Sequence, residues 1–200
     1  MKDFIYCKKN ALSKEKCDAI ISIFNENSHK WVEGKTMVGL EPEKKKCKEL
    51  YVNVNKENPF NNLFLGELCD EVIQYKKEYS FIDEIDNWEL TFTYKIQKYL
   101  PNEGYFCLHC ENSHHTISSI DNRVLVWMIY LNDVTDGGYT EFPQQNKLMQ
   151  PGGGDVLLWP PYWTHPHRGI TSKTQTKYIM TGWFNYSVKG SVPAKFSSMG

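Results

Sequence analysis

Two short motifs in the second half of the chain contain the side chains that typically bind a non-haem metal. The first is His109-Cys110-Glu111, and the second is the His-Pro-His-Arg-Gly segment at residues 165–169. Residues i and i+2 of a β-strand point to the same side, so His109 and Glu111 can offer an imidazole and a carboxylate to one ion. Two histidines and one carboxylate form the facial triad that binds Fe(II) and leaves coordination positions open. We therefore predict an Fe(II) centre whose third ligand is His165 or His167.

Other histidines and cysteines near these motifs are weaker candidates for metal ligands. His114 and His115 lie in a polar stretch between residues 112 and 122, and we expect solvent to reach them. Cys107 and Cys110 form a CxxC pair, but no second pair matches it, so a zinc site is not indicated. We expect Cys110 to point to the opposite side of its strand and to pack as a core thiol.

A lysine downstream of the second motif would suit a co-substrate with two carboxylates. A ferrous site with open positions is inert until a co-substrate supplies electrons, and a dicarboxylate needs a cation at the far end of its pocket. Lys177 begins a predicted strand in which it shares one face with Ile179, Thr181 and Trp183. A buried ammonium is costly when unpaired and satisfied when it pairs with a bound carboxylate. The alternative is a surface lysine at the start of a strand.

The hydrophobic pattern from Trp88 onward predicts the β scaffold that must position these side chains. Apolar and polar residues alternate up to Tyr99, which is typical of a strand with one buried face. The apolar members of this strand are Leu90, Phe92, Tyr94 and Ile96. Four further segments separated by turn signals have strand character: Arg123–Leu131, Tyr139–Phe142, Asp155–Trp159 and Tyr178–Tyr186.

The first half of the chain predicts two helices separated by a long irregular excursion. Ser13 is suited to cap a helix, and apolar residues follow it at helical spacing: Cys17, Ile20, Ile21 and Phe24. Asn61 or Asn62 is expected to cap a second helix, whose apolar stripe would be Leu65, Leu68, Cys69 and Val72. Residues 27–59 show no sustained period apart from a short strand expected at Leu50–Val54. Loops of that length often form lids or binding loops.

The composition of the chain limits the classes of protein to which it can belong. The chain has 200 residues, of which 40% are hydrophobic and 14% aromatic, and this is enough for one compact domain. A net charge of −1 provides no basic surface for nucleic acid or membrane. The six cysteines show no disulfide pattern, and neither a signal peptide nor a segment of transmembrane length is present. We therefore expect a cytoplasmic protein with reduced thiols.

Helices followed by many short strands favour an α+β chain whose second half is an antiparallel sandwich or jelly roll. Across these strands a set of motifs occurs in order: Tyr99, His109-x-Glu111, Tyr130-Leu131-Asn132-Asp133, Gly137-Gly138-x-Thr140-x-Phe142, Pro151-x-x-Gly154-Asp155, His167-Arg168-Gly169, Lys177-Tyr178 and Gly182-Trp183. This constellation resembles the 2-oxoglutarate/Fe(II) dioxygenases of the prolyl 4-hydroxylase type over about residues 88–186. The resemblance implies a double-stranded β-helix, or jelly roll, with the two N-terminal helices supporting one sheet from outside.

The resemblance also implies roles for individual residues. In that family the histidine before an x-Gly pair is the distal iron ligand, which favours His167 over His165. The basic residue about ten positions later binds the C5 carboxylate of 2-oxoglutarate, and here it is Lys177. The implied metal ligands are therefore His109, Glu111 and His167, and the implied 2-oxoglutarate pocket contains Lys177, Tyr99, Tyr130, Thr140 and Trp183.

One departure from the family pattern is that the usual HxD motif is HxE in this chain. The carboxylate of Glu111 reaches one methylene further than that of an aspartate. We interpret Glu111 as a ligand with a longer reach, and the alternative is an impaired site.

The implied activity is hydroxylation of prolyl residues in a peptide or protein, with 2-oxoglutarate and O₂ consumed, succinate and CO₂ released, and ascorbate as a reductant. A single oxygenase domain would span residues 1–200, with support and lid in 1–87, the core in 88–186 and a tail in 187–200. The rivals are a hydroxylase or demethylase of a small molecule or nucleobase, and a non-catalytic jelly roll that binds a metal or ligand. The near-neutral charge argues against a nucleic-acid substrate. Tyr162 and Trp163 are either contacts for a proline ring or packing residues.

Overall fold

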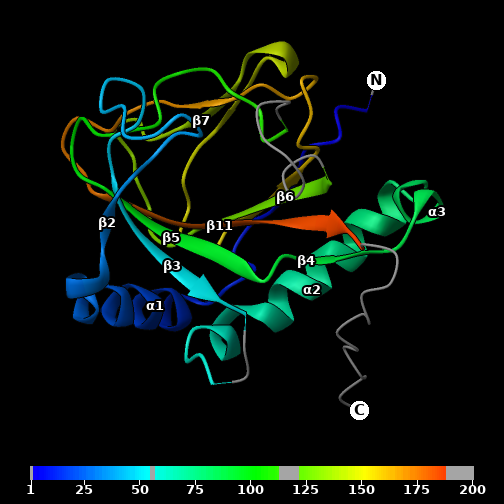
Figure 1. The fold of residues 1–200 in the computed structure, drawn as a ribbon, viewed down its shortest axis with the longest axis horizontal. Coiled ribbons are helices and arrows are strands. Elements are labelled where there is room, and N and C mark those ends of the chain that lie inside the picture. Colours follow the sequence, from blue (N-terminus) through cyan, green and yellow to red (C-terminus); the bar gives the residue numbers. More distant parts are fainter. Residues whose placement is uncertain (1, 55–56, 113–121, 188–200) are drawn as a thin grey trace.

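The chain folds into two β-sheets, with its long helices on one side of the larger sheet (Figure 1). The computed structural model describes residues 2–54, 57–112 and 122–187. The helices are α1 (Lys14–Glu26), α2 (Asn61–Glu78) and α3 (Ile82–Ile85), with 3-10 turns η1 (Ser28–Lys30) and η2 (Pro143–Gln145). The strands are β1 (Tyr6–Lys8), β2 (Val32–Glu33), β3 (Lys48–Asn53), β4 (Trp88–Leu90), β5 (Thr93–Tyr99), β6 (Arg123–Tyr130), β7 (Thr140–Phe142), β8 (Lys147–Met149), β9 (Val156–Trp159), β10 (Arg168–Gly169) and β11 (Lys177–Tyr186).

The large sheet pairs strands that are far apart in the sequence. Its order is β1-β9-β6-β11-β5-β3-β2, and β4 pairs with the end of β11. The small sheet has the order β10-β7-β8. In Figure 1, α1 and α2 lie beneath the large sheet and β7 lies above it. A further antiparallel bridge joins His109 to His167, so the segment after β5 meets the segment before β10.

Alternate residues of the large sheet enter two separate cores. On β6, Leu125, Trp127 and Ile129 belong to the core on the helix side, whereas Val126, Met128 and Tyr130 belong to the core on the opposite side. Trp127 anchors the first core, because it stacks on Phe64 of α2 with ring centroids 5.4 Å apart. A Cβ atom added to Gly182 would lie 2.7 Å from the Trp127 ring. The indole therefore requires glycine at that position of β11.

Both predicted helices are present, and the second begins differently from the prediction. Ser13 caps α1 and accepts a hydrogen bond from the Lys16 amide at 3.4 Å. In α2, neither Asn61 nor Asn62 is the cap, because the helix starts at Asn61 and Phe60 precedes it. The Asn61 side chain is buried instead, and its Oδ1 accepts a hydrogen bond from the Tyr94 hydroxyl at 3.0 Å. The Asn61 side chain therefore makes a tertiary hydrogen bond in place of the capping contact that the local sequence predicted.

The buried stripes of the helices follow the predicted periods with one shift. In α1, Cys17, Ile20 and Phe24 are buried. In α2, Leu68 and Val72 are buried as predicted, while Leu65 and Cys69 are only partly buried. The buried face of α2 extends instead through Phe64 and Tyr75, together with the polar residues Asn61 and Glu71.

The strand predicted from Trp88 to Tyr99 is broken in two. Thr91 lies between β4 and β5, and its hydroxyl hydrogen-bonds to the carbonyl oxygens of Thr93 and Trp183 at 3.1 and 3.0 Å. These bonds bend the chain, so Phe92 points outward and is 64% exposed. Only the second half of the predicted apolar face, Tyr94 and Ile96, is fully buried.

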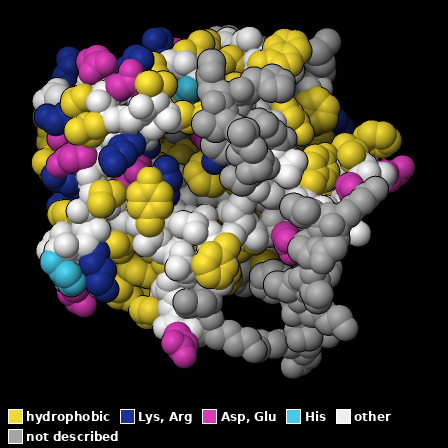
Figure 2. All heavy atoms as spheres, viewed as in Figure 1, with side chains coloured by type: hydrophobic (Ala, Val, Ile, Leu, Met, Phe, Trp, Pro, Cys, Tyr) yellow, Lys and Arg dark blue, Asp and Glu magenta, His cyan; other side chains and the backbone are white. Residues whose placement is uncertain are grey.

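The other predicted strands appear as β3, β6, β7, β9 and β11, with ends shifted by one or two residues. The pattern missed β1, β2, β8 and β10, which are too short to show an alternation. The described cysteines, which include all six in the chain, are free thiols. In the described ranges, no helix combines the length and apolarity needed to cross a membrane. On the face shown in Figure 2, basic and acidic side chains are intermingled, in keeping with the near-zero net charge.

Candidate metal centre

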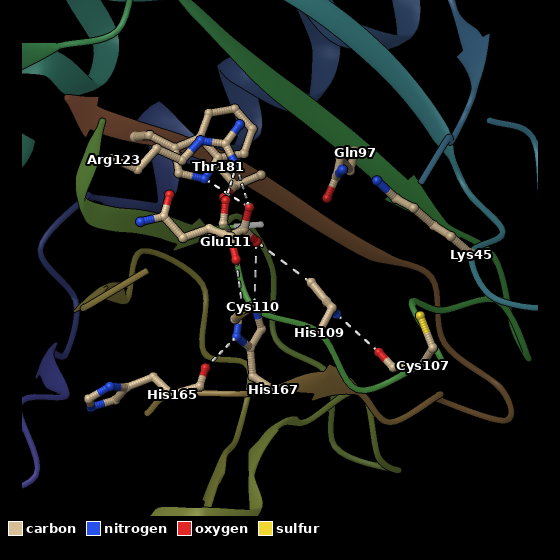
Figure 3. Close-up of polar contacts among 12 residues, drawn as sticks. Lys45, Gln97, Cys107, His109, Cys110, Glu111, Arg123, His165, His167 and Thr181 are labelled. Carbon is tan, nitrogen blue, oxygen red and sulfur yellow. Dashed lines mark hydrogen bonds and ion pairs between the residues drawn. The ribbon is translucent and has the colours of Figure 1, made fainter. Parts of the chain in front are cut away.

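The structure brings His109, Glu111 and His167 together as a potential metal site. The Nε2 atoms of both histidines lie 3.6 Å from Oε1 of Glu111 (Figure 3). Their potential ligand atoms all lie within 4.8 Å of one another. The bridge between the two histidines sets this arrangement, because each backbone amide donates to the carbonyl of the other residue, at 3.0 and 2.8 Å.

Outer hydrogen bonds orient both imidazoles for metal binding. His109 Nδ1 lies 3.0 Å from the carbonyl oxygen of Cys107, and His167 Nδ1 lies 3.1 Å from that of His165. A carbonyl only accepts, so each Nδ1 carries the hydrogen and each Nε2 presents a lone pair toward Glu111. Burial, together with the neighbouring His167, lowers the pKa of His109, which favours the neutral form that metals bind.

The carboxylate of Glu111 is fixed by two donors on its other oxygen. Oε2 accepts hydrogen bonds from Trp183 Nε1 at 2.9 Å and from Arg123 Nη1 at 3.2 Å. Burial alone would raise the pKa of Glu111, but the adjacent His109 and His167 outweigh it and hold the pKa well below its usual range. The site therefore combines neutral imidazole with an ionised carboxylate.

Arg123 is a site residue that the sequence analysis did not single out. Its Nη1 also donates to the carbonyl oxygen of Glu111 at 2.6 Å, and its guanidinium lies 3.7 Å from the centroid of the Trp183 ring. A signal was available, because Arg123 is the only charged residue of β6, whose other members are apolar or aromatic.

The competing ligand His165 points away from the cluster (Figure 3). Its Nε2 lies 2.8 Å from the carbonyl oxygen of Asp3, and its Nδ1 lies 2.9 Å from the hydroxyl of Thr164. The Cys110 thiol is only half-buried and donates to the Asn112 carbonyl oxygen at 3.1 Å, so it is a less buried group than predicted. His114 and His115 lie outside the described residues.

A cavity of about 260 Å³ opens beside the three potential ligands. Its lining includes four of the five residues predicted for the 2-oxoglutarate pocket: Lys177, Tyr99, Thr140 and Trp183. The fifth, Tyr130, is not among the lining residues. Its hydroxyl hydrogen-bonds to the Thr140 hydroxyl at 2.6 Å, so Tyr130 lies one layer behind the wall and orients Thr140.

Lys177 is buried in this cavity and its ammonium has little compensation. Nζ donates to the carbonyl oxygen of Gly138 at 3.0 Å and lies 5.0 Å from the centroid of the Tyr99 ring. Burial lowers the pKa of Lys177 to about 8. Within residues 2–54, 57–112 and 122–187, no carboxylate forms a salt bridge with it. Lys177 is therefore suited to pair with a carboxylate that a ligand brings.

A second buried lysine beside the cavity is neutralised by the protein itself. Lys45 Nζ lies 2.5 Å from Oε1 of Glu49, and Gln97 Nε2 donates to the same oxygen at 2.6 Å. The Tyr99 hydroxyl then donates to Gln97 Oε1 at 2.9 Å. This chain of contacts, which the sequence did not reveal, fixes the Tyr99 side of the cavity wall. Among the described residues of the wall, Lys177 is a buried lysine that has no carboxylate partner.

The residues present fit a divalent metal together with a dicarboxylate. Two imidazole nitrogens and one carboxylate oxygen converge on one point, which is the donor set suited to Fe(II) with open positions. The same cavity contains a buried cation without a carboxylate partner among the described residues. His109, Glu111 and His167 would bind the metal, and Lys177 would bind the far carboxylate.

Comparison with known proteins gives the same family as the motifs. Residues 94–185 match the family model described as the 2OG-Fe(II) oxygenase superfamily. A protein of Acanthamoeba polyphaga mimivirus named "Putative prolyl 4-hydroxylase" is 25% identical to this chain over 189 residues. The match covers 88% of this chain and 71% of the viral protein.

Solved prolyl hydroxylase structures share the fold. A viral collagen prolyl hydroxylase from Paramecium bursaria Chlorella virus 1, in complex with 2OG, aligns with a TM-score of 0.71 at 16% identity, over 92% of this chain and 97% of that chain. A Trichoplax adhaerens prolyl hydroxylase, in complex with a peptide fragment of a hypoxia inducible factor, aligns with a TM-score of 0.70 at 16% identity, over 92% and 84%. A Pseudomonas putida prolyl-4-hydroxylase aligns with a TM-score of 0.68 at 12% identity, over 92% and 94%.

These similarities confirm the predicted jelly-roll fold and the predicted enzyme class. The family implies Fe(II) and 2-oxoglutarate, and its members support prolyl hydroxylation at the level of the family. The match of residues 94–185 to the 2OG-Fe(II) oxygenase superfamily and the similarity to prolyl 4-hydroxylases therefore support a dioxygenase enzyme.

Proposed function

We propose that this chain hydroxylates prolyl residues of a peptide or protein, with Fe(II) bound by His109, Glu111 and His167. The observation that carries the proposal is the presence of this cluster and of the buried Lys177 in one cavity. A buried ammonium without a partner is costly. A bound 2-oxoglutarate would remove that cost, because one end would pair with Lys177 while the other reached the metal.

The side chains of the cavity have distinct tasks in this proposal. Lys177 binds the carboxylate of 2-oxoglutarate that lies far from the metal, and Thr140 offers its hydroxyl near the same carboxylate. Tyr99 forms part of the cavity wall. Trp183 lies at the metal end, where it contacts Glu111. When bound, Fe(II) with 2-oxoglutarate supplies the oxidation that consumes O₂ and yields succinate, CO₂ and an alcohol. The protein contributes by placing the C–H bond and excluding water.

The N-terminal half supports a peptide as substrate. Lys35, Thr36 and Met37, from the excursion predicted to form a lid, line the same cavity as the metal cluster. We assign residues 1–87 to support and lid and residues 88–186 to the catalytic core; most of the assigned tail, 187–200, lies outside the described residues. A proline-containing peptide is already extended, which lowers the ordering cost of binding across the mouth.

The aromatic contacts of such a peptide differ from the initial expectation. Tyr162 and Trp163 are 37% and 76% exposed, but neither lines the cavity. Tyr51 and Trp183 do line it, and Tyr51 is 49% exposed. These two are therefore the better candidates for contact with a proline ring.

The test is mass spectrometry of proline-rich peptides after incubation with the protein, Fe(II), ascorbate and 2-oxoglutarate. The expected product has one oxygen atom added to proline, with one succinate formed per product. The His167→Ala variant and omission of 2-oxoglutarate are the controls, and both should abolish the product. Succinate formed with oxidation of a free amino acid or nucleobase would replace the peptide substrate, and metal binding without any succinate would indicate a non-catalytic jelly roll.

A further inference from the structure

The carboxylate of Glu111 is held from behind, on the side away from the histidines. Trp183 Nε1 and Arg123 Nη1 both donate to Oε2, while Oε1 faces the two Nε2 atoms. We infer that Arg123 and Trp183 are positioning residues that adapt a glutamate to this ligand position, so that it binds metal through Oε1 alone. The inference rests on the metal site proposed above.

Arg123 and Trp183 together form a clamp on Oε2 of Glu111. This clamp compensates for the length of the glutamate side chain. Glutamate has one more rotatable bond than aspartate, so holding its carboxylate in one place costs more conformational entropy. The extra methylene also moves the carboxylate by about one C–C bond, ~1.5 Å. Two donors on Oε2 remove this freedom before metal arrives. The entropy cost is then borne by folding and not by metal binding.

The clamp is itself rigid, because its two members stack on each other and come from paired strands. Arg123 opens β6 and is paired with Asn185 of β11, two residues beyond Trp183. The guanidinium lies 3.7 Å from the Trp183 ring centroid, which is a cation–π contact. Arg123 Nη1 also donates to the carbonyl oxygen of Glu111 at 2.6 Å. The backbone amide of Glu111 donates to the carbonyl oxygen of Pro161 at 3.0 Å. Main chain and side chain of Glu111 are thus fixed together.

Positioning and simple electrostatics predict opposite effects for the loss of Arg123. If the guanidinium acted only through its charge, removing it would strengthen binding of a divalent cation, because a repulsive positive charge would be gone. If it positions Glu111, removing it weakens binding despite that relief. Trp183→Phe is a counterpart that changes no charge, because it keeps an aromatic ring for Arg123 to stack on and deletes the N–H donor together with the second ring of the indole.

The experiment is titration of the full-length protein with Co(II), without 2-oxoglutarate, followed by visible absorbance. Changes in the outer contacts of a metal ligand typically cost ten- to a hundredfold in affinity, so we expect about tenfold weaker binding for Trp183→Phe and for Arg123→Gln. Arg123→Lys should restore only part of the loss, because lysine keeps the charge and the donors but lacks the planar guanidinium that stacks on the Trp183 ring. The matched control is Arg168→Gln, since Arg168 lines the same cavity but pairs with Glu141.

The decisive measurement repeats these changes in the Glu111→Asp background. The shortened carboxylate no longer reaches the clamp, so Glu111→Asp should weaken Co(II) binding, and adding Trp183→Phe should then change it less than about twofold. Far-UV circular dichroism checks that each variant is folded. If Arg123→Gln does not fold, the Co(II) affinity of Trp183→Phe alone tests the inference.

Three results would overturn the inference: unchanged Co(II) affinity in Trp183→Phe, tighter binding in Arg123→Gln, or an equal loss from Trp183→Phe in the Glu111 and Glu111→Asp backgrounds. Loss of affinity in Arg168→Gln as well would point to a general disturbance of the cavity, and not to positioning of Glu111, and would also overturn it. Failure of the metal site itself looks different, because His167→Ala would then bind Co(II) as well as the parent does.

Discussion

The two faces of the large sheet are built by alternate residues of the same strands, yet they have opposite chemistry. On β11 the helix side carries Met180 and Phe184, whereas the cavity side carries Lys177, Thr181 and Trp183. Because the side-chain period of a strand is two, each strand can contribute to stability on one face and to a site on the other.

The cavity face further distinguishes polar groups that the protein satisfies from groups left for a ligand. Glu49 is fully buried, and Lys45 and Gln97 hold it at 2.5 and 2.6 Å. Lys177 is equally inaccessible but bonds only to a carbonyl oxygen. The charge of Glu49 is compensated within the protein by lysine, whereas a buried cation with only a carbonyl partner indicates a binding position.

The largest expected effect separates the two faces through a pair of tryptophans. Trp127 on the helix side and Trp159 on the cavity side are 0% and 2% exposed. Truncating a buried tryptophan typically costs about 3–5 kcal/mol of unfolding free energy, so both Trp127→Ala and Trp159→Ala should unfold at lower denaturant. Only Trp159→Ala should also weaken Co(II) binding in the folded fraction, since its ring packs against His167 at 5.1 Å.

Chemical denaturation with and without metal measures both quantities in each variant. If Trp127→Ala weakened metal binding as much as Trp159→Ala did, the claim that only the cavity face of the sheet supports the metal site would be refuted.

The next effect concerns the two histidines of the second motif. His167→Ala should lose at least about a hundredfold in Co(II) affinity, because removing a ligand exceeds the ten- to hundredfold cost of an outer contact. His165→Ala should keep the affinity and lose some thermal stability, since it frees the carbonyl oxygen of Asp3 and the Thr164 hydroxyl. Isothermal titration with Co(II) decides between them, and equal losses in both variants would reject His167 as the sole distal ligand.

The part of the site that sequence could predict is the part set by local geometry. His109 and Glu111 lie together as their spacing predicted, although the structure has an isolated bridge at His109 and a bend at Glu111 where a strand was expected. His167 and Lys177 lie in motifs with a fixed context. The periods of α1, β6 and β11 likewise follow from hydrophobic spacing within each segment.

What sequence could not predict depends on contacts between distant segments. Arg123 is a site residue only because β6 pairs with β11 next to Trp183. Asn61 lost its expected capping role to a hydrogen bond from Tyr94, and the strand break at Thr91 depends on the Trp183 carbonyl. These contacts between distant segments produce no periodic pattern of residues in the sequence, so the sequence alone could not predict them.

A smaller effect is expected from removing the charge on the cavity face. Lys177→Met should weaken 2-oxoglutarate binding by about ten- to a hundredfold, since a hydrogen bond to a charged group contributes roughly 1.5–3 kcal/mol. It should leave Co(II) affinity unchanged and raise the melting temperature, because a poorly compensated buried charge is gone. Lys98→Met, in which Lys98 contacts Trp31 on the opposite face, is the matched control. An unchanged 2-oxoglutarate affinity in Lys177→Met would remove this residue from the pocket.

The smallest effect is a pH dependence that belongs to the cavity face alone. Burial places the pKa of Lys177 at about 8, against 10.5 for an ordinary lysine. A bound carboxylate requires the ammonium, so above pH of about 8 the protein must take up a proton as 2-oxoglutarate binds, and affinity should fall by up to about tenfold per unit. Cys47 and Tyr99 keep their protons there, because burial raises the pKa of the thiol to about 12 and that of the phenol well above its usual range.

Stability should move in the opposite direction over the same range. Between about pH 8 and 10.5 the unfolded chain holds the Lys177 proton and the folded chain has released it, so the destabilising contribution of Lys177 is complete below pH 8 and is relieved as the pH rises. Calorimetric titration of the Co(II)-loaded protein with 2-oxoglutarate, in two buffers of different ionisation enthalpy, measures the proton uptake directly. Lys177→Met should show neither the uptake nor this stability term, whereas Lys98→Met should show both. Uptake that persisted in Lys177→Met would mean that another group titrates on binding.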